Sequence, residues 1–288
     1  VAIAYFLLYI FPNLVSNRKL RRQLILGLSV TATLLYSIKT ISRNKVWKDN
    51  LTLATNDARI SIRGAKSNVM AGGLMSEEAA KEGNPQVKAQ MLKESIGYLK
   101  NAVEIYPEYI DALLLMGNVQ WEYTKKASYA FPYYQRILNI NNQHQNTWQN
   151  LFIVLEQEKD VNYRIKAYRQ LLNYAYQQDK IYLNLGRAYG REKQDLNTSI
   201  QMMEKGLEIA PNNYDLLTNL GTAYGLSQNY GRAIEVLKRA IQIQPNNSKT
   251  YIDLGLSYYY LNNLEEAKKV FDKASQLDPN LNRSQFPI

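Results

Sequence analysis

Residues 251–279 read YIDLGLSYYYLNNLEEAKKVFDKASQLDP, and residues 217–245, which lie 34 positions earlier, read LTNLGTAYGLSQNYGRAIEVLKRAIQIQP. Both stretches place a large residue, Leu-Gly, Tyr, Ala, a bulky apolar residue, a second Ala and a closing Pro at the same offsets. A third copy, from Tyr182 to Pro211, keeps this order and needs one extra residue between its two expected helices. A repeated interval of this length indicates a stack of two-helix units.

The shared positions have a physical reason. Gly186, Gly221 and Gly255 fall where the two helices of each unit would approach most closely, so a larger side chain would force the helices apart. The large residues around each glycine would fill the volume beside that contact. The closing proline stops the second helix because it has no backbone N–H and clashes with the preceding turn.

This pattern resembles the tetratricopeptide repeat (TPR), which has large–x2–Leu–Gly–x2–Tyr, then Ala–x3–Phe, then Pro. The resemblance implies an all-α fold, a TPR α-solenoid of about six helix–turn–helix repeats. Weaker copies extend upstream, so we expect an array over 65–282 with repeats at 65–109, 110–144, 145–178, 179–213, 214–247 and 248–281, and then a tail at 283–288.

Two features of the array depart from the simple repeat. The first repeat is expected to carry an insertion of about ten residues around 81–89, with a break at Gly83-Asn84-Pro85. The last repeat has no capping helix after it. Its second helix, which bears Phe271, is therefore expected to be exposed or covered by a partner.

The first 42 residues form a separate region, which we expect to be membrane-embedded. Residues 1–11 are apolar and read as the second half of a spanning helix, which would make the chain a piece of a longer protein. Residues 24–41 hold one charge, Lys39, and are near the lower length limit for a complete span. The intervening segment 16–23, expected as a loop, holds four basic residues: Arg18, Lys19, Arg21 and Arg22.

Basic loops of this kind stay in the cytoplasm, which predicts that the chain after Ser42 lies on the non-cytoplasmic side, periplasmic or lumenal. A pair of core helices in a soluble protein remains the alternative for this region.

The linker 43–64 contains Arg43, Asn44, Trp47 and Leu53, and Ala65-Lys66 opens the first repeat. An Arg-Asn-x-x-Trp-x5-Leu stretch between a last membrane span and TPRs resembles the C-terminal part of the transmembrane-and-TPR glycosyltransferases, the protein O-mannosyltransferase-like proteins. In that family the catalytic acidic residues lie in loops of the upstream membrane domain, so the resemblance implies no catalytic residue in this chain. Trp47 is also typical of a membrane interface, and neither interpretation excludes the other.

Composition excludes several kinds of site. The chain has no cysteine, so it has no disulfide, thiolate metal site or cysteine nucleophile. The formal charge is +10, of which residues 1–42 supply +5, and the other 246 residues carry only a mild excess. We therefore expect no nucleic-acid partner.

Catalytic motifs are missing from the sequence as well. The single histidine, His144, stands in Asn-Asn-Gln-His-Gln-Asn without metal-ligand spacing, and there is no phosphate-binding glycine loop. We expect a solvated loop histidine, no cofactor, no metal and no enzymatic activity in this segment, while a longer parent chain could still be a glycosyltransferase.

A candidate binding surface follows from helical periodicity. Positions 2, 6, 9 and 13 of each repeat lie opposite the glycine at position 8 and so face the groove of a TPR array. Position 6 holds Asn150, Asn184, Asn219 and Asp253, a set that we call the position-6 row. Each amide offers a donor and an acceptor, so the row could bond an extended peptide backbone. Asn at this position is common in TPRs, so repeat ancestry is the alternative explanation.

Residues beside the row suggest the chemistry of a ligand. Lys180, Arg187 and Arg191 would suit an acidic segment or a C-terminal carboxylate. The apolar neighbours would suit an apolar anchor, and they are Ile153, Leu256, Tyr259 and Tyr260.

The sequence thus predicts a membrane-anchored TPR scaffold for protein–protein interaction or the assembly of a cell-envelope complex. Its expected partners are a polypeptide in the groove, the lipid bilayer and other subunits of a membrane complex. The alternative is the non-catalytic C-terminal portion of a polytopic membrane glycosyltransferase that acts on protein or envelope acceptors.

Overall fold

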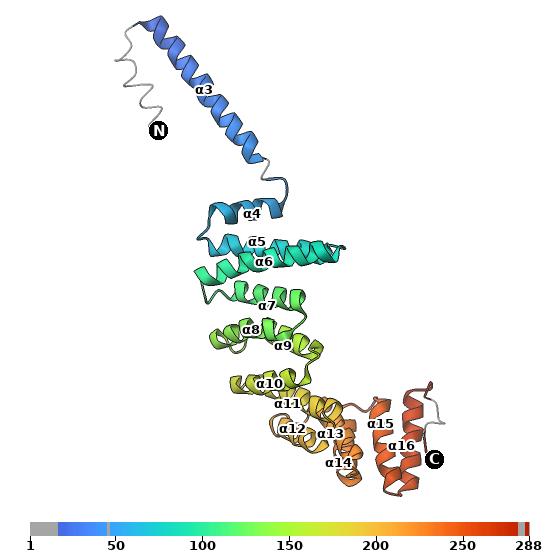
Figure 1. The fold of residues 1–288 in the computed structure, drawn as a ribbon. Coiled ribbons are helices and arrows are strands. Elements are labelled where there is room, and N and C mark those ends of the chain that lie inside the picture. Colours follow the sequence, from blue (N-terminus) through green and yellow to red (C-terminus); the bar gives the residue numbers. More distant parts are fainter. Residues whose placement is uncertain (1–16, 45–46, 282–285, 288) are drawn as a thin grey trace. The chain divides into compact units, whose positions relative to one another are not determined.

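The computed structural model describes residues 17–44, 47–281 and 286–287, and these contain helices and no strand. The all-α prediction is therefore confirmed: successive helices run back and forth and are joined by short turns (Figure 1). The chain divides within helix α7 (Ile110–Thr124) into a unit that ends at Val119 and a unit that begins at Gln120. Each unit is described by itself below.

The first described helix, α3, runs from Arg18 to Asn44. The Asn17 side chain accepts hydrogen bonds from the backbone N–H groups of Lys19 (3.0 Å) and Leu20 (3.1 Å), as an N-cap residue does. The expected basic loop 16–23 is therefore wrong from residue 18 onward, because this cap starts the helix before the basic cluster. The partial helix expected at 1–11 lies outside the described residues.

The linker 43–64 contains a helix that the sequence did not predict, α4 (Asn50–Ile60). The Asp49 carboxylate caps it by accepting from the Thr52 N–H at 2.7 Å. Ala54 and Ala58 of α4 are buried against Ala71 of the next helix. Small residues on one face let the helix lie directly on the array, so much of the segment expected as linker is folded structure.

The first repeat consists of α5 (Ala65–Lys81) and α6 (Pro85–Ile105). The expected insertion at 81–89 does not form a loop, because only residues 82–84 separate the two helices. Instead both helices are long, with 17 and 21 residues, against 13 and 14 in α13 (Tyr214–Leu226) and α14 (Tyr230–Ile243). Asn84 caps α6 and Pro85 occupies its first turn, where a proline costs no hydrogen bond.

The second unit continues the alternation of helices. After the end of α7 it contains α8 (Ala127–Ile140), α9 (Gln145–Gln157), α10 (Val161–Leu171), η3 (Leu172–Tyr174), α11 (Gln178–Arg187), η4 (Ala188–Glu192), α12 (Leu196–Ile209), α13, α14, α15 (Ser248–Tyr260) and α16 (Leu264–Leu277).

The predicted glycine contacts are present in the last three helix pairs. A Cβ atom added to Gly221 would lie 2.5 Å from Leu237 Cγ, and one added to Gly255 would lie 2.5 Å from Phe271 Cε1. In the pair α11–α12 a Cβ on Gly186 would lie 2.7 Å from a Met203 carbon. Equivalent glycines thus hold the two helices of each repeat at close approach.

The extra residue of the third copy is taken up inside its first helix. We expected it between the two helices, but η4 is a π-helical turn that continues directly from α11. The Lys193 N–H donates to the Ala188 carbonyl at 3.2 Å, five residues back. A π-turn accommodates one inserted residue without breaking the helix. The helix pair therefore closes normally, and Ser199 Oγ donates to the Gly186 carbonyl at 2.7 Å.

The end of the array is closed by the chain's own tail. The Phe271 side chain is buried, and the ring of Phe286 stacks on it with the ring centroids 4.5 Å apart. The expected exposure of the Phe271-bearing face is therefore wrong, because an aromatic residue of the tail covers it.

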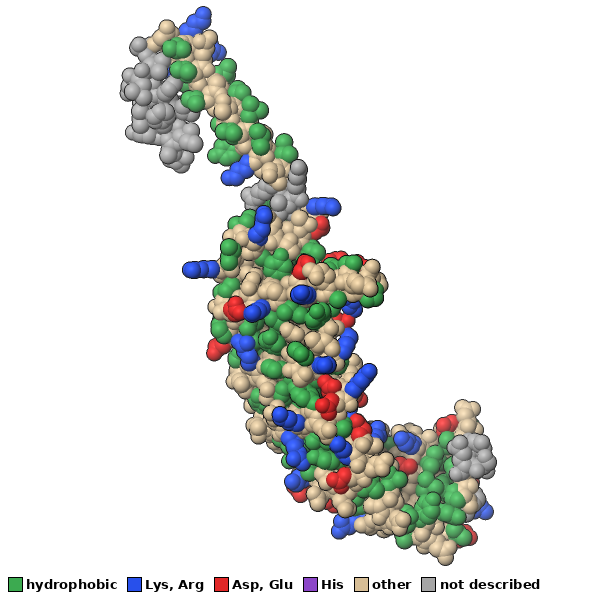
Figure 2. Space-filling view, viewed as in Figure 1, with side chains coloured by type: hydrophobic (Ala, Val, Ile, Leu, Met, Phe, Trp, Pro, Cys, Tyr) green, Lys and Arg blue, Asp and Glu red, His purple; other side chains and the backbone are tan. Residues whose placement is uncertain are grey.

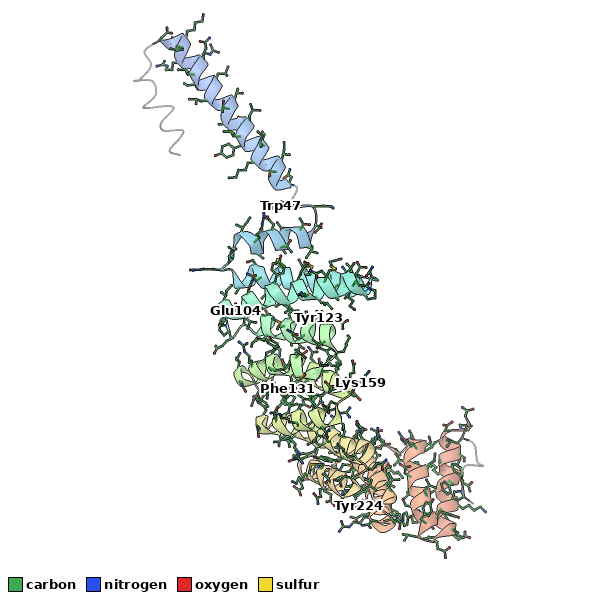
Figure 3. All side chains as sticks on the ribbon, viewed as in Figure 1. Trp47, Glu104, Tyr123, Phe131, Lys159 and Tyr224 are labelled. Carbon is green, nitrogen blue, oxygen red and sulfur yellow. The ribbon has the colours of Figure 1, made fainter. Side chains whose placement is uncertain are left out.

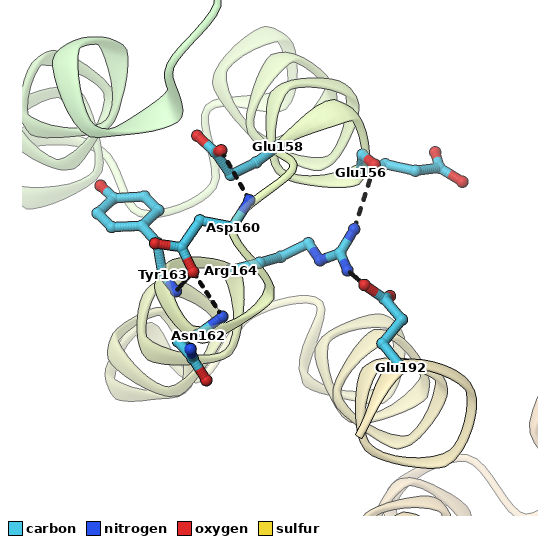
Figure 4. Close-up of polar contacts among 7 residues, drawn as sticks. All are labelled: Glu156, Glu158, Asp160, Asn162, Tyr163, Arg164 and Glu192. Carbon is cyan, nitrogen blue, oxygen red and sulfur yellow. Dashed lines mark hydrogen bonds and ion pairs between the residues drawn. The ribbon is translucent and has the colours of Figure 1, made fainter. Parts of the chain in front are cut away.

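Polar contacts join neighbouring helix pairs of the second unit (Figure 4). Buried Glu158 accepts from the backbone N–H of Ala127 at 2.6 Å and so caps α8, whose own N-cap residue has no side-chain acceptor. Arg164 of α10 forms an ion pair with Glu192 of η4 and also donates to the Glu156 carbonyl at 3.4 Å. These bonds fix η4 against the preceding repeat.

Candidate functional site

A pocket of about 340 Å³ opens along the first helices of the last three repeats. We call it the groove. Its walls come from α11, η4, α13 and α15, and from the side chains of α12 that face them. The lining residues are Gly186, Arg187, Gly190, Arg191, Leu196, Ser199, Met203, Tyr214, Asp215, Thr218, Asn219, Thr222, Ala223, Leu226, Asn247, Lys249, Thr250 and Asp253.

Four residues predicted from the sequence line this groove: Arg187, Arg191, Asn219 and Asp253. Four further lining residues also stand at these repeat positions, although the sequence analysis did not name them. Positions 2, 9 and 13 hold Asp215, Thr222, Leu226 and Lys249. The contribution of Ser199 and Met203 depends on how α12 packs, which periodicity within one helix does not reveal.

The other candidates of the second unit do not line the groove. Lys180 and Ile153 are exposed, and Asn150 is half-buried on α9. Leu256 and Tyr259 pack partly against the apolar core of the last repeats. Tyr260 is exposed at the end of α15, where its ring stacks on Tyr230 with the centroids 5.1 Å apart.

The amides of the position-6 row are already bonded within their own helices. Asn184 donates to the Lys180 carbonyl at 2.9 Å, and Asn219 donates to the Asp215 carbonyl at 2.7 Å. The expectation that each amide offers a free donor to a ligand is therefore only partly correct, because one of its two N–H bonds serves the helix.

The acceptor atoms of the row face the preceding repeat. Asn219 Oδ1 accepts from Arg187 Nε at 3.3 Å and from an Arg191 guanidinium nitrogen at 3.4 Å. One repeat later, Asp253 Oδ2 accepts from Thr222 Oγ1 at 3.0 Å. In both cases position 9 of one repeat donates to position 6 of the next, so the groove wall is a ladder of bonds between repeats.

The charges along the groove are unequal. Arg187 and Arg191 stand at the α11–η4 end, whereas Asp253 stands at the α15 end. Burial raises the pKa of the Asp253 carboxyl, and the hydrogen bond from Thr222 and the nearby charge of Lys249 act in the opposite direction. The α11–η4 end therefore carries two cationic groups, whereas the α15 end carries one cation, Lys249, beside the Asp253 carboxyl.

His144 has a structural role. It is the N-cap residue of α9 and is half-buried, with its Nδ1 3.3 Å from the Thr147 N–H and 2.8 Å from Thr147 Oγ1. The prediction of a solvated loop histidine is wrong, because the side chain closes the first turn of a helix. Within residues 17–44 and 47–281 no group of three acidic or histidine side chains is arranged to hold a metal ion.

The membrane-interface candidates lie on or near α3. Arg18–Ser42 is long and apolar enough to cross a bilayer, and none of its apolar window is buried in the protein. Figure 2 shows hydrophobic side chains along this helix and basic side chains at its beginning, where Arg18, Lys19, Arg21 and Arg22 lie. Trp47 lies between α3 and α4 with an exposed ring (Figure 3).

The matched family models define the class of the C-terminal part. Residues 179–213, 202–235 and 226–285 match models described as tetratricopeptide repeat. These residues are therefore TPRs, as the sequence predicted. No curated protein matches the chain.

Solved structures agree with this class. The chain is similar to the crystal structure of MamA protein, with 19% identity and a TM-score of 0.50 over 63% of this chain and 97% of that chain. This likeness shows a shared fold and does not extend to function.

Two other solved structures match less completely. YrrB, described as a TPR protein with an unusual peptide-binding site, has 13% identity and a TM-score of 0.38 over 79% of this chain and 93% of that chain. The first TPR of Spaghetti (RPAP3), bound to an HSP90 peptide, has 27% identity and a TM-score of 0.35 over 36% of this chain and 82% of that chain.

Proposed function

We propose that this chain is a membrane-anchored scaffold that binds an extended polypeptide in its groove. A TPR fold is suited to protein–protein interaction, and the observation that carries the proposal is the groove itself. Three successive repeats contribute polar side chains to one continuous wall, and the two guanidinium groups of Arg187 and Arg191 stand at one end of it. An extended segment that lies across this wall would accept hydrogen bonds from the side-chain amide N–H groups that are not already bonded within the helices.

The anchoring part of the proposal rests on α3. Most of its large apolar side chains are exposed, and those of Leu26 and Leu35 are exposed by more than half. Apolar surface left in water costs about 25 cal/mol per Å², so a helix of this kind is stable only when it is covered. A bilayer would cover it along its whole length, since about 20 residues cross the hydrocarbon core.

The sidedness follows from charge. The basic side chains of the first turns of α3 would stay in the cytoplasm, which puts the repeats on the periplasmic or lumenal side. The chain has no cysteine, so single cysteines can report this directly. We expect Asn229→Cys, in the α13–α14 turn, to react with a membrane-impermeant maleimide in intact cells, and Lys19→Cys to react only after permeabilisation. Labelling of both before permeabilisation, or release of the protein by alkaline carbonate, would refute the anchored topology.

Peptide binding is tested with the full chain in detergent micelles on an array of immobilised peptides. We expect Asn219→Ala to weaken binding of the retained peptides by about 1–3 kcal/mol, because Asn219 lines the groove and its amide would lose the hydrogen bonds that it forms with a bound backbone. Asn212→Ala, an exposed position in the α12–α13 turn, serves as the control. If the array retains no peptide, or if Asn219→Ala and the control bind alike, the groove is not a polypeptide site.

A second candidate function is the non-catalytic tail of a membrane glycosyltransferase. The resemblance of Arg43, Asn44, Trp47 and Leu53 to the linker of that family favours it. In that case the polypeptide in the groove would be an acceptor substrate held for chemistry in an upstream membrane domain. Glycosyl transfer to a groove-binding peptide by the complete gene product, lost on deletion of the repeats, would distinguish this candidate from a scaffold.

A further inference from the structure

The turn between α4 and α5, residues 59–66, carries the most exposed large apolar side chains of the described residues. We call it the corner. Ile62 is 74% exposed and Ile60 is 72% exposed, each more than any large apolar side chain of α3. Apolar surface is unfavourable in water, and two such side chains on one turn are typical of a surface that another molecule or a membrane covers.

The isoleucines stand among cationic side chains. Arg59, Arg63 and Lys66 are exposed, and none of them forms an ion pair with a carboxylate of the described residues. With Asp57, which precedes them, they are the charged residues of 57–76. An apolar tip with a basic rim is suited to an anionic lipid surface, because apolar side chains enter the acyl region while cations stay among the headgroups.

We propose that the corner is a second membrane contact, which binds anionic phospholipid. Ile60 and Ile62 enter the bilayer around α3, and a pocket beneath α4 holds the phosphate-bearing headgroup of one lipid. This inference rests on the anchoring part of the proposed function and is independent of the groove in the second unit.

The headgroup pocket has a volume of about 610 Å³ and lies where α4 packs along α5 (Figure 1). Arg59 and Ile62 belong to both the corner and the pocket wall, so the two form one continuous site. The other residues that the ligand would meet are polar: Asn56, Asn68, Tyr98 and Asn101. A guanidinium among amides and a hydroxyl is suited to a phosphodiester, whose charged oxygens accept strong hydrogen bonds from several donors.

Polar groups of this pocket retain hydrogen-bonding capacity for a ligand. Asn68 is only 2% exposed; its Nδ2 donates to the Gly64 carbonyl at 2.9 Å, and its Oδ1 accepts no hydrogen bond from the described residues. Tyr98 packs partly against the small residues that join α4 to α5, and neither its hydroxyl nor the Asn101 amide is bonded to a described residue. A headgroup with a phosphate and free hydroxyls would satisfy these donors and acceptors.

Arg59 is already held at the pocket wall. One guanidinium nitrogen, Nη2, donates to Asn56 Oδ1 at 3.1 Å, which leaves most of the five N–H groups for a phosphate. A neutral amide oxygen is a weaker partner than an anionic oxygen, so a phosphate would be bound in addition to the amide or in its place.

Hydrogen bonds also fix the backbone of the corner. The Ser61 N–H donates to the Asp57 carbonyl at 2.8 Å, and the Gly64 N–H donates to the Ser61 carbonyl at 2.8 Å. Ser67 Oγ then donates to the Gly64 carbonyl at 2.9 Å. The two isoleucines are therefore presented on a turn that is ordered before lipid binds, which reduces the entropy lost on binding.

The bilayer is the occupant that the chain itself holds nearby. Five residues separate the end of α3 at Asn44 from the start of α4 at Asn50, and α4 has 11 residues. The corner therefore lies within about 40 Å of the end of α3 by chain length alone. A tethered contact of this kind needs little affinity of its own. A second copy fits less well, because a symmetric contact would bring these cations against their own equivalents.

The test uses the full chain reconstituted into lipid vesicles. Because the chain has no cysteine, Ile62→Cys can carry a single NBD fluorophore. The vesicles contain phosphatidylcholine alone or an increasing share of phosphatidylglycerol, and doxyl-labelled lipids quench a fluorophore that enters the bilayer. Leu26→Cys, within α3, reports on anchoring, and Leu226→Cys, an exposed leucine of the second unit, is the matched control.

We expect quenching at Ile62→Cys to be at least about threefold stronger with phosphatidylglycerol than without it, because the cations gain an anionic partner. Leu26→Cys should be quenched in both kinds of vesicle and Leu226→Cys in neither. Adding Arg59→Gln and Arg63→Gln should remove the dependence on phosphatidylglycerol. Adding Tyr98→Phe and Asn101→Ala keeps the charge and should still raise the share of phosphatidylglycerol needed for half-maximal quenching. Lys205→Gln, an exposed charge of α12, should change nothing.

Equal quenching of Ile62→Cys with and without phosphatidylglycerol, or no effect of the Tyr98 and Asn101 changes, would overturn the headgroup site. Blue-shifted NBD emission without quenching by doxyl lipids would mean that protein covers the corner, which also refutes the inference. If Leu26→Cys is quenched and Ile62→Cys is not, the corner contact fails while the anchor stands; if neither is quenched, both fail. Far-ultraviolet circular dichroism verifies that each variant is folded.

Discussion

The helix contact at Gly221 allows a test of the packing that defines the repeat. In Gly221→Ala the new methyl group would lie 2.5 and 2.6 Å from two carbons of Leu237, which is fully buried. Overpacking of this kind costs about 1–3 kcal/mol. Replacing glycine by alanine within a helix returns about 0.5–1 kcal/mol. We therefore expect a net loss that is centred on about 1 kcal/mol and reaches at most about 2.5 kcal/mol in the stability of α13 and α14.

The same helix supplies a matched control. A Cβ atom on Gly225 would meet nothing within 4 Å, so Gly225→Ala should gain about 0.5–1 kcal/mol through helix propensity alone. Both variants are compared with the wild-type chain by urea unfolding, followed by circular dichroism at 222 nm, and by hydrogen exchange of the α13 and α14 amides. The reasoning would be refuted if Gly221→Ala were as stable as wild type, or if the two substitutions shifted the urea midpoint in the same direction.

Three further predictions concern single side chains of the second unit. Glu158→Ala should cost about 1–3 kcal/mol and speed exchange of the Ala127 amide proton, because that N–H loses its buried acceptor. Phe286→Ala should cost about 1–2 kcal/mol and expose Phe271 to solvent, measured as faster hydrogen exchange in α16, and unchanged exchange would mean that the tail does not cap the array. Asp253 has a raised pKa, so the folded state holds its proton more tightly than the unfolded state, and stability falls as the pH rises through the folded pKa. Asp253→Asn should therefore melt at a higher temperature than wild type at neutral pH, with the difference shrinking in acid, and a difference that does not depend on pH would contradict this account.

The sequence predicted those features that depend on local spacing. Gly186, Gly221 and Gly255 identified the helix contacts because the helix period places each of them on the inner face of its repeat. The same period identified Arg187, Arg191 and Asn219 as neighbours across the groove. It could not show that Asn219 would be engaged by both arginines, since that depends on the offset between two repeats and on side-chain conformation.

Other features depend on choices that spacing leaves open. The extra residues of the first repeat could have formed a loop or longer helices, and Asn84 with Pro85 starts α6 early enough to favour the helices. The charge of the basic cluster after Asn17 favoured a loop. The Asn17 side chain instead caps a helix that begins at Arg18, so the cluster is helical. The ring of Phe286, in the tail, stacks on Phe271, and this contact lies outside the repeat pattern, so the spacing of the repeats could not predict it.

The wide turn of η4 affects how this array tolerates changes in length. The inserted residue is absorbed where the first helix of the repeat ends, and the same helix pair still closes through the hydrogen bond from Ser199 to Gly186. Later repeats therefore keep their phase, and the surplus residue displaces side chains on one turn only. A gain of one amino acid can in this way give a single module a new arrangement of charged groups while its neighbours stay as they were.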